Sequence, residues 1–174
     1  MDNGSQDERY LSAAAEYGAA LERLARAYEA DPDQRNDLLQ DIHLALWRSF
    51  AGYDRRCSVR TWVYRVAHNA ASSHVLRRRR VNPAKRVSLE ELELVADSAN
   101  PERWISEQQA LARLTDMIRA LKPPDSQVML LYLEDINASA IGEITGLSAR
   151  AVATRIHRIK AVLTKRFQEG GQDD

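Results

Sequence analysis

Residues 137–160 read NASAIGEITGLSARAVATRIHRIK. An asparagine opens a short apolar stretch, Gly146 closes it, and Ser148 opens a longer stretch whose apolar residues recur at helical spacing. Asparagine and serine are preferred N-cap residues, and glycine supplies the left-handed turn that ends many helices. The pattern predicts a helix over 138–145, a glycine turn, and a second helix from 149 to about 167. This is the helix-turn-helix plan, in which the second helix enters a DNA major groove.

The second of these helices carries polar and basic residues opposite its apolar stripe. Arginine can pair with guanine edges, while threonine and flanking arginines can hold phosphates. The predicted duplex contacts are Ser148, Arg150, Thr154, Arg155, His157 and Arg158. The alternative is an exposed helix with ordinary solvated charges. The capped helix and the glycine turn directly before it favour DNA contact.

A second basic segment, Arg48–Arg80, lies earlier in the chain. It holds nine arginines and one acidic residue, so its net charge is +8 although the whole chain is neutral. Aromatic residues and an amide are interleaved with this charge, at Tyr53, Trp62, Tyr64 and Asn69. Such a mixture is typical of a surface that binds phosphates while stacking on exposed bases. The alternative is a solvated basic face with Trp62 in the core.

Acidic segments flank Arg48–Arg80 on both sides. Residues 1–47 carry four basic and ten acidic residues, and residues 81–109 carry three and six. The acidic front end suits a protein partner, and the later segment suits a connector between two nucleic-acid contacts.

Helical periodicity runs through the chain and no strand candidate stands out. We expect an all-α protein of two small helical domains, at residues 6–80 and 105–169. A flexible acidic linker over 81–104, with one helical turn, joins them and has no fixed structure in the free protein. In the first domain Asp31 should cap a second helix, which follows one over 6–30, and Ser58 should cap a third.

The third helix has a predicted inner and outer face. The inner face comprises Val59, Val63, Val66, Ala67 and Ala70. The residues expected to point outward are Thr61, Arg65, His68, Ser72 and Arg79.

Several classes of protein and site are excluded. The single cysteine, Cys57, rules out an internal disulfide framework and a cysteine-based zinc site. The chain lacks a glycine-rich phosphate loop, a nucleophile beside a base, and a carboxylate pair placed for acid–base chemistry. We therefore expect no enzyme, no cofactor and no metal. A polar start and the lack of an 18-residue apolar run predict a cytoplasmic protein without membrane insertion.

The combination resembles the sigma-70 class of bacterial RNA polymerase initiation factors, in their two-domain extracytoplasmic-function (ECF) form. The resemblance covers roughly residues 17–80 and 110–167. Asp31-Pro32 with Asp37-Leu38-Leu39-Gln40-Asp41 resembles the helix that docks on the clamp helices of the polymerase β′ subunit. Residues 61–69, TWVYRVAHN, resemble the stretch that reads the melted minus-ten element, and residues 138–160 resemble the helix-turn-helix that binds the minus-thirty-five element.

The resemblance implies roles for particular residues. The polymerase contacts would be Asp37, Gln40 and Asp41. The minus-ten contacts would be Trp62, Arg65, His68, Asn69, Ser72, Arg77 and Arg78, with Trp62 and Asn69 helping to open the strands and hold bases. The minus-thirty-five contacts would be the six residues named above on the last helix.

The implied partners are core RNA polymerase, through its β′ clamp helices and β flap, and promoter DNA. The resemblance also allows for an anti-sigma protein as a partner. The expected function is to direct core polymerase to specific promoters and to help open the minus-ten element. One alternative is a stand-alone helix-turn-helix regulator that binds duplex DNA. Another is an interaction protein whose basic patches bind an acidic partner.

Overall fold

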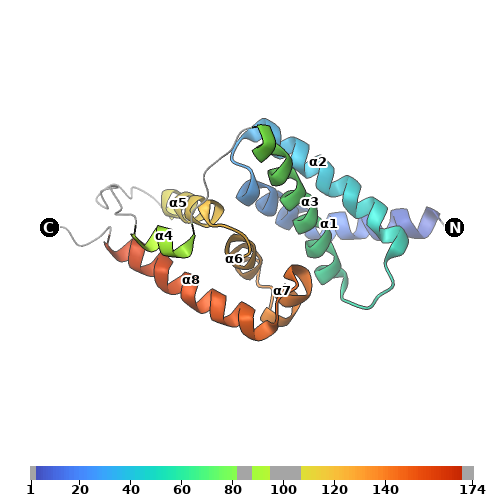
Figure 1. Cartoon of the computed structure of the whole chain (residues 1–174). Helices are drawn as coiled ribbons and strands as arrows, with labels where there is room; N and C mark the ends of the chain where they lie inside the picture. The colour runs from blue at the N-terminus through green and yellow to red at the C-terminus, as the bar shows by residue number, and fades with distance from the viewer. Residues whose placement is uncertain (1–2, 82–87, 95–106, 170–174) are drawn as a thin grey trace. The chain divides into compact units, whose positions relative to one another are not determined.

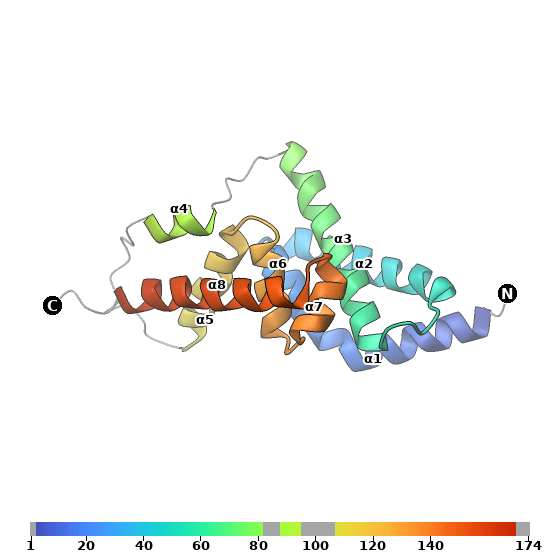
Figure 2. The same cartoon turned by 60° about the horizontal axis from the view of Figure 1, so that its bottom comes forward.

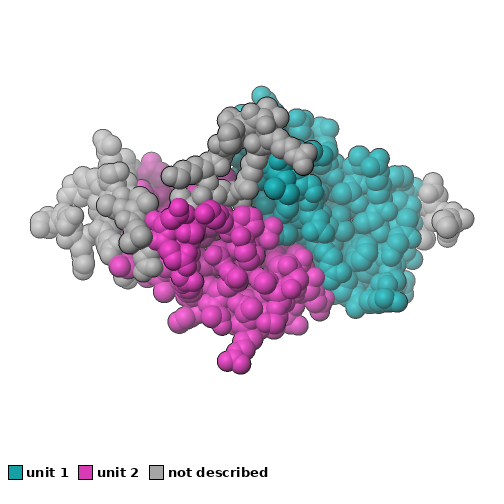
Figure 3. Space-filling view, viewed as in Figure 1, with its two compact units in different colours: residues 1–84 teal, residues 85–174 magenta. Residues whose placement is uncertain are grey.

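The computed structural model describes residues 3–81, 88–94 and 107–169, which form α-helices joined by short turns (Figure 1). The prediction of an all-α fold is confirmed. The chain divides into two compact units, Met1–Ala84 and Lys85–Asp174 (Figure 3). Within the described ranges, no helix is long and apolar enough to cross a membrane.

Unit 1 is a bundle of three helices. They are α1 (Asn3–Tyr28), α2 (Pro32–Ser49) and α3 (Val59–Val81), and the short 3₁₀ turn η1 (Phe50–Gly52) follows α2. Each pair of helices is in contact, with α2 against α3 as the most extensive interface (Figure 1). The largest fully buried side chains of this unit are Leu21, Leu38, Ile42, Leu46, Phe50 and Val63.

Two predicted caps begin α2 and α3. The carboxylate of Asp31 accepts a hydrogen bond from the backbone N–H of Gln34 at 3.0 Å, and Pro32 takes the first helical position. Ser58 Oγ accepts one from the N–H of Thr61 at 3.1 Å. These caps satisfy backbone donors that no helical carbonyl can reach.

The predicted inner face of α3 is partly wrong. On α3, Val59 is 38% exposed, whereas Thr61 is buried. The buried face of α3 is therefore rotated from the predicted one. Helical periodicity defines a stripe of residues, but the contacts with α1 and α2 decide which stripe faces inward.

Unit 2 contains α4 (Leu89–Leu94), α5 (Glu107–Ala120), α6 (Asp125–Leu133), α7 (Ala138–Thr145) and α8 (Ala149–Glu169). The predicted helix-turn-helix is α7, its turn and the first part of α8. Asn137 Oδ1 accepts a hydrogen bond from the N–H of Ala140 at 2.9 Å, and Gly146 has a φ of 78°. The largest fully buried residues of unit 2 are Ile118, Leu121, Leu131, Ile141, Ile159 and Val128.

The structure describes only part of the predicted linker. Residues 82–87 and 95–106 lie outside the described residues. Between them, residues 89–94 form α4, a helix that packs against α8 (Figures 1 and 2). This short helix agrees with the one helical turn expected in the linker, and its Leu89 and Leu92 are buried. The lack of fixed structure in the free protein stays a prediction.

Candidate nucleic-acid interface

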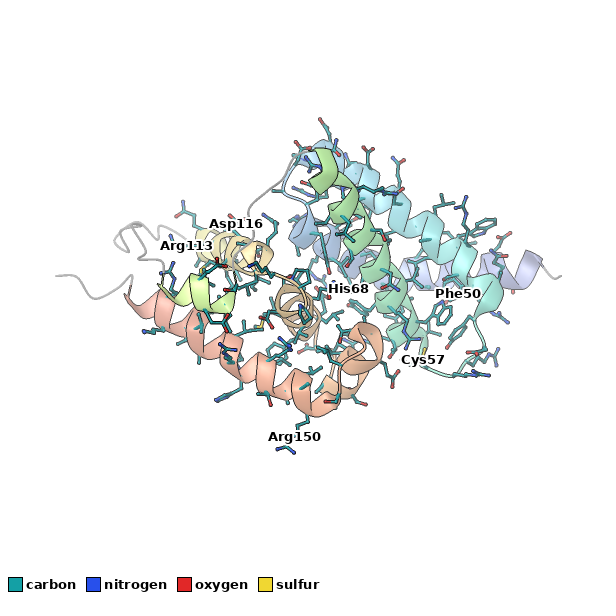
Figure 4. All side chains as sticks on the ribbon, in the orientation of Figure 1. Phe50, Cys57, His68, Arg113, Asp116 and Arg150 are labelled. Atoms are coloured by element: carbon teal, nitrogen blue, oxygen red, sulfur yellow. The ribbon has the colours of Figure 1, made fainter. Side chains whose placement is uncertain are left out.

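The exposed face of α8 gathers most of the residues predicted to contact duplex DNA. All but one of the six are exposed, namely Ser148, Arg150, Thr154, His157 and Arg158. Figure 4 shows Arg150 pointing outward from the helix. On the other side of α8, Val152 and Ile159 are fully buried against unit 2. Burial of the apolar stripe thus leaves the basic stripe exposed to solvent, as a DNA-reading helix requires.

Arg155 differs from the other five residues. It is half-buried, and its guanidinium forms an ion pair of 2.6 Å with the carboxylate of Asp125 at the start of α6. A bidentate contact to a base edge would compete with this pair. The structural role of Arg155 in joining α8 to α6 makes it a poor choice for testing DNA contact, and Arg150 is the cleaner position.

A stripe on α3 gathers part of the predicted minus-ten set. Trp62, Arg65, Asn69 and Ser72 follow one another at spacings of three and four residues, which places them on one side of a helix. Asn69 is exposed, and the other three are half-buried. Leu76, 59% exposed, continues the stripe and was not anticipated from the sequence.

His68 does not belong to this stripe. It is only 2% exposed, and its ring Nδ1 lies 2.6 Å from the hydroxyl of Tyr28 on α1. The expectation that His68 points outward is wrong, because position 68 falls on the inner face with Tyr64 and Ala71. In this conformation the side chain has no access to DNA.

The loop between η1 and α3 adds residues that were not among the predicted DNA contacts. The Tyr53 ring lies 5.2 Å from the Trp62 ring, centroid to centroid, and Trp62 Nε1 donates to Ser49 Oγ at 3.0 Å. Tyr53 and Arg55 also line a cavity of about 460 Å³ between this loop and α1. Arg55 has a φ of 64°, a conformation that non-glycine residues rarely adopt and that often marks functional loops.

The basic end of α3 is partly neutralised by acids from the other helices. Arg77 forms an ion pair of 2.5 Å with Asp41 of α2, and Arg78 pairs with Glu29 at the end of α1. The side chains of Arg79 and Arg80 lie outside the described residues. Arg77 and Arg78 are therefore paired with carboxylates in the folded chain, and a phosphate would have to displace these carboxylates. The charge count did not reveal these pairs.

Glu29 is the buried centre of the second pair. Its side chain is 9% exposed, and His74 Nε2 lies 3.6 Å from the carboxylate. Burial by itself would raise the pKa of Glu29. Hydrogen bonds from Arg78 and from the backbone N–H of Asp31, with the nearby charge of Arg78, outweigh burial and lower this pKa below its ordinary value of 4.5. The carboxylate is thus stabilised in its ionised form.

Glu29→Gln is expected to destabilise unit 1 by about 1–3 kcal/mol near neutral pH, because a buried charged hydrogen bond is lost. A folded-state pKa below 4.5 means that Glu29 stabilises the fold above that pH and loses this effect as the pH falls through the folded value. Urea unfolding followed by helix content should therefore show a difference between variant and wild type that shrinks on acidification. The exposed Glu22 of α1 provides the control Glu22→Gln, expected to change little. An equally large loss of stability at acidic pH would contradict the role of the ionised carboxylate.

The predicted polymerase contacts lie on one side of α2. Asp37 and Gln40 are exposed, and the Asp41 side chain is 44% exposed while paired with Arg77. Leu44, one turn further on, is 45% exposed. Acidic residues around an exposed leucine form a surface on which a partner can bury both charge and apolar area.

Comparison with known proteins places both units in one family. The model "Sigma-70 region 2" matches residues 14–81, and "Sigma-70, region 4" matches residues 111–163. RNA polymerase sigma factor NccH of Alcaligenes xylosoxydans is 28% identical over 158 residues, covering 87% of this chain and 83% of its own length. ECF RNA polymerase sigma factor SigW of Bacillus subtilis is 25% identical, with 88% and 83% covered.

A further relative is also known as a structure. RNA polymerase sigma factor CnrH of Cupriavidus metallidurans is 28% identical over 156 residues, covering 86% of this chain and 82% of its own. The structure of CnrH in complex with the cytosolic domain of CnrY aligns with a TM-score of 0.67, 19% identity and 97% coverage of both chains. The fold, the two matched regions and the named relatives agree: this chain belongs to the sigma-70 family of RNA polymerase sigma factors, in its ECF form.

Proposed function

We propose that this chain binds core RNA polymerase, directs it to specific promoters and helps to open the minus-ten element. One observation supports this most strongly. The two units present different chemistry, an exposed polar and basic face on α8 and, on α3, a stripe with the half-buried Trp62 and the exposed Asn69. The first suits intact duplex, and the second suits unpaired bases.

On α8, we assign the minus-thirty-five contact to the exposed face that includes Arg150, Thr154 and His157. Arginine can pair bidentately with guanine, and the smaller polar residues can bind phosphates or base edges. The face lies on a helix held by a buried stripe, so the side chains are presented without a large loss of conformational freedom.

On α3, we assign capture of the melted strand to Trp62, Asn69 and the adjoining loop. Unstacking a base costs a few kcal/mol, and stacking on an aromatic side chain recovers about 1–3 kcal/mol per base. Tyr53, which contacts Trp62, also lines the cavity beside α1, and this cavity is the proposed place for an unstacked base.

Polymerase docking is assigned to α2, at Asp37, Gln40 and Asp41. The chain would carry out no chemistry itself, because the polymerase supplies the catalytic site, and it would work in the cytoplasm with that enzyme. We also propose control by a protein of the anti-sigma kind, since the relative CnrH forms a complex with the cytosolic domain of CnrY.

Transcription reconstituted with core polymerase on genomic promoter fragments tests the proposal. Arg150→Ala should weaken holoenzyme binding to the upstream duplex by about 1–3 kcal/mol. Asn69→Ala should leave this step intact and reduce open-complex formation, and a template melted in advance at the minus-ten element should restore it. Permanganate footprinting reports strand opening, and mobility shifts report duplex binding.

Two outcomes would contradict the proposal. One is a chain that does not associate with core polymerase. The other is a free chain that binds one duplex sequence tightly at physiological salt, together with an Asn69→Ala variant that opens DNA normally. That second result would identify a stand-alone regulator.

A further inference from the structure

The helix α4 is a defined element of unit 2. Ser88 Oγ accepts a hydrogen bond from the N–H of Glu91 at 3.1 Å, and the Glu91 carboxylate accepts one from the N–H of Ser88 at 2.6 Å. This reciprocal pair is a capping box, which satisfies two backbone donors at the start of a helix. The sequence from Ser88 to Glu91 thus begins α4 at a specific residue.

Packing on α8 holds α4 in place. Leu89 and Leu92, three residues apart, are 2% and 7% exposed, and α4 lies along α8 in both views (Figures 1 and 2). A helix of six residues is too short to be stable alone in water. The order of α4 therefore depends on its contact with α8.

The outer side of α4 places a carboxylate beside the exposed basic face of α8. Glu90 pairs with Arg158, which shares the exposed face of α8 with Arg150 and His157. The neighbouring Glu91 lies 3.4 Å from Lys122, in the turn between α5 and α6. The Arg158 and Glu90 side chains are 57% and 60% exposed, so solvent screens their attraction and a phosphate can displace the carboxylate.

We propose that α4 is an intramolecular competitor of DNA, in which Glu90 occupies the guanidinium of Arg158 that would otherwise contact a phosphate. This rests on the proposed function of α8 as the duplex-reading helix. DNA binding and the α4 contact are then linked reciprocally. Any partner that holds residues 88–94 away from α8 raises the affinity of unit 2 for duplex, and duplex binding loosens α4.

The salt dependence of DNA binding tests this directly. The slope of log K against log salt is negative, and each phosphate contact increases its magnitude by about 0.9, whatever the sequence of the duplex. We would measure fluorescence anisotropy of the full chain with a random duplex of about 20 base pairs, between about 50 and 200 mM salt. Glu90→Gln should steepen the slope by up to about 0.9 and tighten binding several-fold at low salt.

Glu91→Gln is the matched control, because it makes the same change of charge in the same helix but releases Lys122 instead. It should leave the slope as in wild type. Leu89→Ser, which removes an apolar contact of α4, should reproduce the gain of Glu90→Gln. Arg158→Gln should lower the slope of the Glu90→Gln chain more than it lowers that of wild type.

The failure modes are distinguishable. Equal gains from Glu90→Gln and Glu91→Gln, or a gain that persists without Arg158, would overturn the competition and leave only an effect of net charge. Arg150→Ala reports on α8 itself. If Arg150→Ala lowers the slope and Glu90→Gln does not raise it, the competition alone is wrong. If Arg150→Ala has no effect in any background, the assignment of α8 to duplex fails, and the competition with it.

Discussion

Gly142→Ala is expected to destabilise unit 2 by about 2–4 kcal/mol and to abolish duplex binding, because the added methyl group would overlap neighbouring backbone atoms. A Cβ at position 142 would lie 2.5 Å from the carbonyl oxygen of Leu147 and 3.5 Å from the backbone N of Ala149. Both atoms belong to the backbone that links α7 to α8, so no side-chain rotation can relieve the overlap. The turn of the helix-turn-helix would have to open.

Gly18→Ala is the matched control on α1. A Cβ there meets nothing within 4 Å, so the same substitution should be neutral or should stabilise unit 1 by up to about 1 kcal/mol through helix propensity. Hydrogen exchange read by mass spectrometry separates the two units. Faster exchange in α6 to α8 of Gly142→Ala, with α1 to α3 unchanged, is the expected pattern. Wild-type exchange in α7 and α8 of this variant would refute the steric argument.

Asp41→Arg is expected to weaken binding to core polymerase by about 2 kcal/mol or more, which is about thirty-fold. The variant reverses a charge in the middle of the proposed docking face, beside Asp37 and Gln40. Helix content should stay unchanged, since the Asp41 side chain is 44% exposed on the outer side of α2. Affinity for core polymerase can be measured by competition with a labelled wild-type chain.

The ion pair between Asp41 and Arg77 calls for a second variant. Arg77→Gln breaks the same pair from the α3 side and leaves the acidic face intact. It should bind core polymerase as wild type does or slightly better, because Asp41 no longer has an internal partner. Normal affinity of Asp41→Arg would remove α2 from the docking assignment. An equal loss in Arg77→Gln would show that the pair shapes the surface and that Asp41 is not itself the contact.

Local signals in the sequence were sufficient for the helices and their ends. Asp31, Ser58 and Asn137 cap helices where the sequence predicted, and Gly146 makes the predicted left-handed turn. Capping and glycine turns depend on atoms within a few residues, so a single sequence carries their full description. The exposed basic face of α8 was predictable for the same reason, because its buried stripe is strongly periodic.

The sequence by itself determined that this protein is all-helical, that it ends in a helix-turn-helix, and which residues share each helical stripe. Only the tertiary structure decided which stripe of α3 is buried, and it placed His68 inside against Tyr28. It also paired Arg78 with Glu29, 49 residues away, and Arg158 with Glu90, 68 residues away. Periodicity reports angles around one helix axis, whereas these contacts depend on how separate helices pack, and a count of charges along the chain contains no such information.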